Sequence, residues 1–114
     1  MQLFRRKSEL SPKEIIQFCE KNHAKNVVLN SDGTVDVEWF YLITPVSNNV
    51  LPCQFNKIAT DFNVSGNKLK SLKGSPIEVG RDFDCSGNLI VDLDFSPRKV
   101  DGSFKCGISK NSYL

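Results

Sequence analysis

The chain has 114 residues, of which 39% are hydrophobic and 25% are charged, and its formal net charge is +2. This composition is that of an ordinary globular protein rather than a disordered one, and the length suits one small core. A net charge this small argues against charge-driven binding to nucleic acid as the main activity. We therefore expect a single domain spanning residues 1–114.

The first ten residues form a basic segment that contains Arg5, Arg6 and Lys7, and no apolar run follows it. A secretory signal needs an apolar stretch of about seven residues or more, and a membrane helix needs about twenty. We therefore expect a cytoplasmic protein without a membrane span. Its four cysteines should then be reduced thiols.

Residues 11–36 are predicted to form a cap made of one helix and one β-hairpin. The run Ser11-Pro12-Lys13-Glu14 combines a capping box with proline at the first helical position, so the helix should begin at Ser11 and end near His23. The residues after it contain Asp32-Gly33, a pair typical of tight hairpin turns. The helix should cover the first edge of the remaining fold with an apolar face of Ile15, Phe18 and Cys19.

From residue 37 onward the sequence repeats itself with a period of 21 residues. Shifting the chain by this period aligns four apolar columns: Val37, Ile58, Val79 and Val100; Tyr41, Phe62, Phe83 and Phe104; Ile43, Val64, Cys85 and Cys106; Leu51, Leu72, Leu93 and Leu114. Each copy contains an apolar–x–apolar pair with strand periodicity, and the two central copies continue with an asparagine and then leucine or isoleucine, as leucine-rich repeats do. We predict an α+β fold, a leucine-rich-repeat-like parallel β-solenoid of about four coils over residues 37–114.

Asn67 and Asn88 occupy the asparagine position of this repeat. Their side-chain amides can bond backbone groups of neighbouring coils, and buried loop backbone needs such partners. We therefore assign them a structural role.

Two sets of motifs carry a family resemblance. Residues 29–37 are similar to an N-x-D-G-T-V-D-V opening, and the blocks at 51–55, 61–67, 72–76 and 79–80 are similar to one recurring repeat. Together, over residues 14–114, the chain resembles small leucine-rich-repeat-like proteins of tailed bacteriophages, especially the larger contractile-tailed ones. The resemblance implies the solenoid fold and an accessory protein, and it assigns no functional residue. The chain departs from the pattern at Arg81, at Ile90-Val91 and at residues 94–96, so the turns there should differ.

The outward face of the predicted strands is the candidate partner-binding surface. Side chains alternate across a strand, and burying the odd residues from Val35 to Ile43 would turn Phe40 and Leu42 outward. These two are either covered by Leu3-Phe4 or exposed as an apolar patch for a partner. The predicted partner-binding residues are Phe40, Leu42, Asp61, Asn63, Asp82, Asp84 and Lys105.

No cofactor, metal or catalytic centre is predicted. Cys19 and His23 are four residues apart on the helix, but a structural zinc needs four ligands and only Cys53 is a further candidate. His23 is the single histidine, so no nucleophile has an obvious base. Cys85 and Cys106 should have Cα atoms roughly 4.8 Å apart, which permits a disulfide, although reduced thiols are expected in a cytoplasm.

The predicted function is a non-enzymatic protein-interaction module, a phage accessory protein that binds and modulates or inhibits a host protein. The alternatives are a nucleic-acid-binding accessory protein that uses the lysines of the turns, and a virion-associated structural component. We expect a monomer in which residues 108–114 fold over the strand around residues 103–107. The other outcome is that a second chain pairs with this strand to form a dimer.

Overall fold

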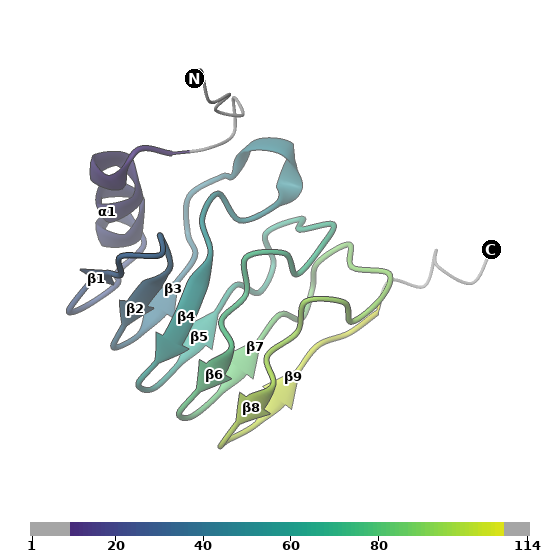
Figure 1. Ribbon diagram of the computed structural model, residues 1–114. Coiled ribbons are helices and arrows are strands. Elements are labelled where there is room, and N and C mark those ends of the chain that lie inside the picture. The colour runs from purple at the N-terminus through teal and green to yellow at the C-terminus, as the bar shows by residue number, and fades with distance from the viewer. Residues whose placement is uncertain (1–9, 109–114) are drawn as a thin grey trace.

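The computed structural model describes residues 10–108 and contains one α-helix followed by short strands (Figure 1). Helix α1 spans Pro12–Lys21. The strands are β1 (Val28–Leu29), β2 (Val35–Val37), β3 (Phe40–Tyr41), β4 (Phe55–Ile58), β5 (Phe62–Asn63), β6 (Glu78–Val79), β7 (Phe83–Asp84), β8 (Lys99–Val100) and β9 (Phe104–Lys105), and a 3-10 helix, η1, spans Ser47–Asn49.

The strands form two sheets, in the orders β1-β2-β4-β6-β8 and β3-β5-β7-β9. Strand β1 pairs with β2 antiparallel, and the neighbours that follow in both sheets are parallel. Each coil gives one strand to each sheet: coil 1 holds β2 and β3, coil 2 β4 and β5, coil 3 β6 and β7, and coil 4 β8 and β9. The predicted parallel β-solenoid is confirmed. The four expected coils are present as four strand pairs, and the chain makes about three turns in passing from the first pair to the last.

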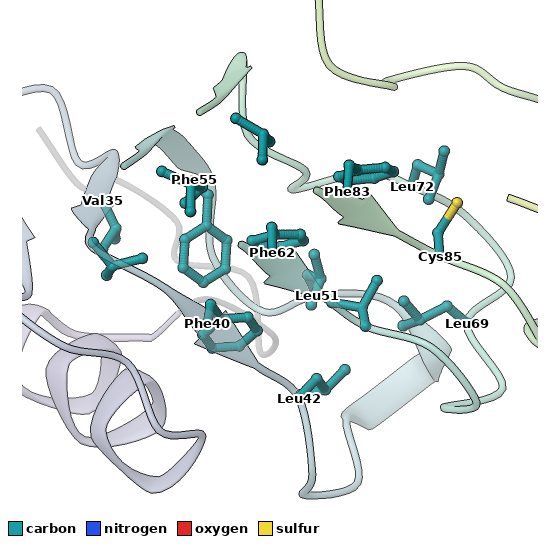
Figure 2. Packing of buried hydrophobic residues seen from close by; sticks show 14 of the residues in the cluster. Val35, Phe40, Leu42, Leu51, Phe55, Phe62, Leu69, Leu72, Phe83 and Cys85 are labelled. Atoms are coloured by element: carbon teal, nitrogen blue, oxygen red, sulfur yellow. The ribbon is translucent and has the colours of Figure 1, made fainter. Parts of the chain in front are cut away.

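The core lies between the inner faces of the two sheets and is built around stacked phenylalanine rings (Figure 2). Ring centroids are 5.2 Å apart for Phe40 and Phe62, and 5.7 Å apart for Phe62 and Phe83. Phe55 of the other sheet lies 4.6 Å from Phe40 and 5.0 Å from Phe62. The members of the aligned apolar columns that belong to the two central coils and lie in this core are Phe62, Val64, Leu72 and Phe83.

The ring column begins at Phe40, not at Tyr41 as the 21-residue shift predicts. Phe40 pairs with Phe62, so the spacing at β3 is 22 residues. At β2 the spacing is 20 residues for Val35 with Phe55 and 21 for Val37 with Ile58, because the register shifts between these two pairs. The cause of the longer spacing at β3 is the connection between the two strands of a coil. It has two residues in coil 1, 38 and 39, and three in coil 2, 59 to 61.

The shorter connection reverses the alternation of side chains in coil 1. Phe40 is 0% exposed and Leu42 is 6% exposed, whereas Tyr41 is 36% and Ile43 is 61% exposed. The prediction that Phe40 and Leu42 face outward as a partner patch was therefore wrong. Both side chains belong to the core that the two sheets enclose.

The asparagines of the repeat hold successive coils together through their side-chain amides. The Asn88 Oδ1 accepts from the backbone N–H groups of Asn67 and Leu69, each at 2.9 Å. Its Nδ2 donates to the carbonyls of Val64 and Cys85, also at 2.9 Å. Asn67 likewise donates to carbonyls of its own coil and of coil 1. The predicted structural role of both asparagines is confirmed.

The N-terminal cap has the predicted form. The Ser11 Oγ accepts from the Glu14 N–H at 3.2 Å, and a Glu14 carboxylate oxygen accepts from the Ser11 N–H at 2.8 Å. Cys19 is buried, Ile15 and Phe18 pack against the core, and the Phe18 ring centroid lies 5.7 Å from that of Phe40. The β1–β2 hairpin turns at Gly33, whose φ of 88° suits glycine. Figure 1 shows the helix at the β1 end of the stack.

Asn22, just after the helix, ties the cap to coil 1. Its side chain is fully buried, and its Oδ1 accepts from the backbone N–H groups of Ile43 at 2.7 Å and Thr44 at 3.0 Å. Its Nδ2 donates to the carbonyl of Phe18 at 2.9 Å. One side chain thus satisfies a helix-end carbonyl and two backbone donors of the strand end.

Removing residues 1–25 should give an insoluble or aggregated protein. The truncation removes Phe18 and so uncovers the face of the Phe40 ring that it contacts, and it removes the hydrogen bonds of Asn22. An apolar end of the solenoid is then left facing water. Expression of the truncated chain, followed by sedimentation and size-exclusion chromatography, checks this. A soluble monomer would show that α1 is not the required cover.

The far end of the solenoid is covered less completely. Ile108 is partly buried against the core, while Phe104 of coil 4 is 42% exposed. Tyr113 and Leu114, expected to help cover this end, lie outside the described residues, as does the Leu3-Phe4 segment. Among residues 10–108, no helix has the length and apolar character needed to cross a membrane.

Candidate protein-binding face

The outward side of the four-stranded sheet gathers most of the predicted site residues. We define the strand face as this surface. It carries Tyr41, Ile43, Asn63, Asp84 and Lys105, with Asp61 and Asp82 at the strand entrances. The parallel register places Tyr41, Asn63, Asp84 and Lys105 in one row across the coils. The structure therefore brings the predicted polar residues together, and it replaces Phe40 and Leu42 with their neighbours.

Asp61 and Asp82 each bond the backbone of the following coil. The Asp61 Oδ1 accepts from the Asp82 N–H at 3.1 Å, and the Asp82 Oδ1 accepts from the Ser103 N–H at 2.8 Å. Each carboxylate is thus fixed at one oxygen and is only partly buried. Both residues have a structural task that sequence reasoning had not given them.

Asn63 and Asp84 fix the turns that leave the strands. The Asn63 Oδ1 accepts from the Ser65 N–H at 2.9 Å and from the Ser65 hydroxyl at 2.7 Å. Asp84 makes the same pair of bonds with Ser86, at 3.0 and 2.6 Å. These are Asx turns, in which the side chain replaces a backbone acceptor. The side chains of Asn63 and Asp84 are therefore held in place by the turns that they close.

Tyr41 and Ile43 form the apolar end of the strand face, at coil 1. The Tyr41 hydroxyl donates to the Asp61 Oδ2 at 3.3 Å. Partial burial and the neighbouring Asp61 carboxylate raise the pKa of Tyr41, so the phenol stays protonated at neutral pH. Sequence reasoning missed both residues because it continued the alternation of Val35 and Val37 through a connection that is one residue short.

The cysteine and histidine of the cap do not come together as the helical spacing allowed. Cys19 is buried, whereas His23 lies past the end of α1, is exposed, and has a left-handed φ of 60°. Within the described residues no three His, Cys, Asp or Glu side chains are grouped to hold a metal ion. A hydrogen bond to Cys19 and burial raise the pKa of Cys53, so this thiol stays protonated and is a poor nucleophile.

Cys85 and Cys106 form a disulfide between coils 3 and 4, with Cα atoms 4.7 Å apart. The predicted spacing is confirmed, and the expectation of two free thiols was wrong. Because both residues occupy the same inward column of neighbouring parallel strands, one strand spacing brings them within bonding reach. Cys19 and Cys53 remain free.

A groove of about 530 Å³ runs over the outer side of the five-stranded sheet. Its lysines, Lys57 and Lys99, alternate with the acidic side chains of Asp36, Glu78 and Asp101. Lys99 also approaches Asp101 at 4.0 Å. A groove that binds a nucleic-acid backbone needs a continuous line of positive charges, whereas this groove carries charges of both signs.

The chain matches no family model, no curated protein and no solved structure with which it was compared, so the resemblance to phage solenoid proteins stays a prediction.

Proposed function

We propose that this protein is a non-enzymatic protein-interaction module that docks a partner protein on the strand face. The observation that carries the proposal is an exposed apolar pair, Tyr41 and Ile43, beside carboxylates that backbone bonds already hold in place. Protein interfaces commonly combine an aromatic or apolar centre with a polar rim. Side chains that are fixed before binding lose little conformational entropy when a partner arrives.

The charges of the strand face suggest the chemistry of the partner. The bonds that fix Asp82 and Asp84 use the Oδ1 atom of each carboxylate and leave its Oδ2 for a partner, whereas the Asp61 Oδ2 accepts from the Tyr41 hydroxyl. A complementary partner would place an apolar side chain on Ile43 and basic groups beside Asp61, Asp82 and Asp84. The resemblance to phage accessory proteins supports a host protein as this partner, with modulation or inhibition as the outcome.

The test is affinity capture with the tagged full chain, followed by binding of the purified partner by calorimetry. Ile43→Lys should weaken binding by at least about tenfold, because it places a charge in the apolar centre. Val91→Lys is the matched control: Val91 is similarly exposed, at 52%, and lies outside the strand face. It should bind normally.

Two results would contradict the proposal. If Ile43→Lys and Val91→Lys bind the partner equally well, the strand face is not the docking surface. If capture is lost on nuclease treatment and falls steeply with salt, the protein binds nucleic acid instead.

A further inference from the structure

The outer side of the five-stranded sheet carries a row of charges whose sign alternates from coil to coil. We define the charge ladder as the four residues that recur there at the 21-residue period: Asp36, Lys57, Glu78 and Lys99. Lys57 is the register partner of Glu78, and Glu78 is the register partner of Lys99. Asp36 joins the row because its Oδ1 accepts from the Lys57 N–H at 3.0 Å. Each coil therefore presents one charge, at a strand spacing of roughly 4.8 Å from the next.

The two central charges of the ladder are not used inside the chain. Lys57 and Glu78 are exposed, and the side chain of neither makes an ion pair or a hydrogen bond with another described residue. Alternation of sign has one purely structural benefit, because neighbouring strands then carry no like charges. That benefit does not require the head groups of Lys57 and Glu78, which remain available for a partner.

A groove of about 530 Å³ runs beside the charge ladder, two residues further along each strand. The row of residues there is Glu38, Ala59, Gly80 and Asp101. Between the ladder and this row, Ile58 and Val79 point into the core and are 3% and 1% exposed. A Cβ at Gly80 would collide with the carbonyl of Ala59, so the chain has no larger side chain to fill the middle of the groove. Coils 2 and 3 thus present a charged ridge next to an open channel.

The order of the charges makes the ladder complementary to a copy of itself. From coil 1 to coil 4 the signs are negative, positive, negative and positive, and from coil 4 to coil 1 each sign is reversed. A twofold axis between coils 2 and 3 therefore sets opposite charges side by side. Lys57 meets Glu78 of the second copy, and Asp36 meets its Lys99. A ladder of one sign would instead be repelled by its copy.

We propose that the charge ladder and its groove are a dimerisation surface whose occupant is the same surface of a second copy of this chain. The ladder of each copy lies in the groove of the other, over Ala59 and Gly80, where no large side chain obstructs it. The aliphatic stem of Lys57 packs on the groove floor while its ammonium reaches the second copy's Glu78. The mixture of signs that disfavours a nucleic-acid backbone is the feature that fits this occupant.

The ends of the ladder fit the same arrangement less strongly than its centre. Lys99 of each copy lies beside Asp36 and over Glu38 of the other, so one ammonium meets two carboxylates. Asp36 also approaches Asp101 of the other copy, and Lys99 beside both carboxylates offsets this like-charge contact. The Asp36 Oδ1 is already engaged by its own chain. The pairs of Lys57 with Glu78 are therefore the decisive ones, and each occurs twice in the dimer.

This inference goes beyond the proposed function and stands apart from it. The strand face is the outer side of the four-stranded sheet, and the core separates it from the charge ladder on the five-stranded sheet. Ile43→Lys should therefore dimerise as the wild type does. Loss of partner binding and loss of self-association are separate results, so the failure of one proposal leaves the other standing.

The test is self-association of the full chain, measured by sedimentation equilibrium at low and at high salt. The wild type should dimerise at low salt and lose at least about tenfold in affinity at about 0.5 M salt, because salt screens exposed charges. Lys57→Glu and Glu78→Lys should each weaken the dimer at low salt by at least about tenfold, since each reversal creates two like-charge pairs across the axis.

Reversing both charges should restore the dimer. The chain that carries both substitutions, and equally an equimolar mixture of the two single variants, again opposes charges of unlike sign. Lys70→Glu is the matched control for Lys57→Glu: Lys70 is an exposed lysine outside the ladder and the groove, and the net charge changes by the same amount. It should dimerise normally. Circular dichroism shows whether each variant keeps the fold, and restoration on mixing is a result that a misfolded variant cannot give.

Three results would overturn the proposal. The first is a wild type that stays monomeric at low salt at every concentration. The second is a dimer that Lys57→Glu weakens no more than Lys70→Glu does. The third is a folded double variant, or a mixture of folded single variants, that associates no better than the single variants alone.

Discussion

Phe83→Ala should lower the free energy of unfolding by about 3–5 kcal/mol, the range for truncating a fully buried phenylalanine. The Phe83 side chain is 0% exposed, and its ring lies between those of Phe62 and Phe104, at 5.7 and 5.2 Å. Alanine removes both ring contacts and leaves a cavity at the junction of coils 3 and 4. Since a small domain has about 5–15 kcal/mol of total stability, this loss is a large part of it. Urea denaturation followed by circular dichroism measures the difference.

Phe95→Ala is the matched control for this substitution. Phe95 is 61% exposed and has a φ of 70°, so its ring contributes little to the core. The same chemical change there should alter stability by no more than about 0.5 kcal/mol. Equal effects at Phe83 and Phe95 would mean that the ring column does not stabilise the solenoid.

The repeat could be predicted from the sequence because stacked coils impose the same environment at each period. Every inward position of coils 2 and 3 meets an equivalent position above and below, so the same residue types recur at columns such as Phe62 and Phe83. The helix could be predicted because its capping signals are local, within residues 11–14. Both features depend on contacts that a reader can infer from spacing alone.

The orientation of coil 1 could not be predicted in this way. The connection between β2 and β3 has one residue fewer than the connection between β4 and β5, and this difference reverses which side chains face inward. Nothing in the residues Glu38-Trp39 themselves indicates that the connection is shorter than in the later coils. The apolar alternation of Val35 to Ile43 continues across it and conceals the change. The apolar pair of the strand face therefore differed from the predicted one by a single position, Tyr41 and Ile43 in place of Phe40 and Leu42.

Two other features depend on contacts between distant residues. The partners of Asn22 lie about one repeat further along the chain, at Ile43 and Thr44, so its role emerges only when the cap is placed on coil 1. For Cys85 and Cys106 the spacing followed from the repeat, but spacing permits a disulfide and two thiols equally well. The expectation of thiols came from an assumed reducing cytoplasm, and the repeat pattern carries no information about the compartment.

Asn88→Ala should lower the free energy of unfolding by at least about 3 kcal/mol, although it removes no core hydrocarbon. Asn88 is 8% exposed, and its side chain bonds the N–H groups of Asn67 and Leu69 and the carbonyls of Val64 and Cys85. Alanine leaves these four backbone groups without that partner in a buried turn. Each unsatisfied buried group costs about 1–3 kcal/mol, and water admitted to the gap should recover part of the total.

Asn56→Ala is the control that separates this effect from the loss of any asparagine. The Asn56 side chain is only partly buried, and its Nδ2 donates to the Asp36 Oδ1 at 3.0 Å. Losing this single bond at a partly solvated site should cost about 1 kcal/mol or less. Denaturation of both variants under the same conditions gives the comparison. If Asn88→Ala is no more destabilised than Asn56→Ala, the asparagine bonds between coils do not stabilise the stack, and the phenylalanine column must do so without them.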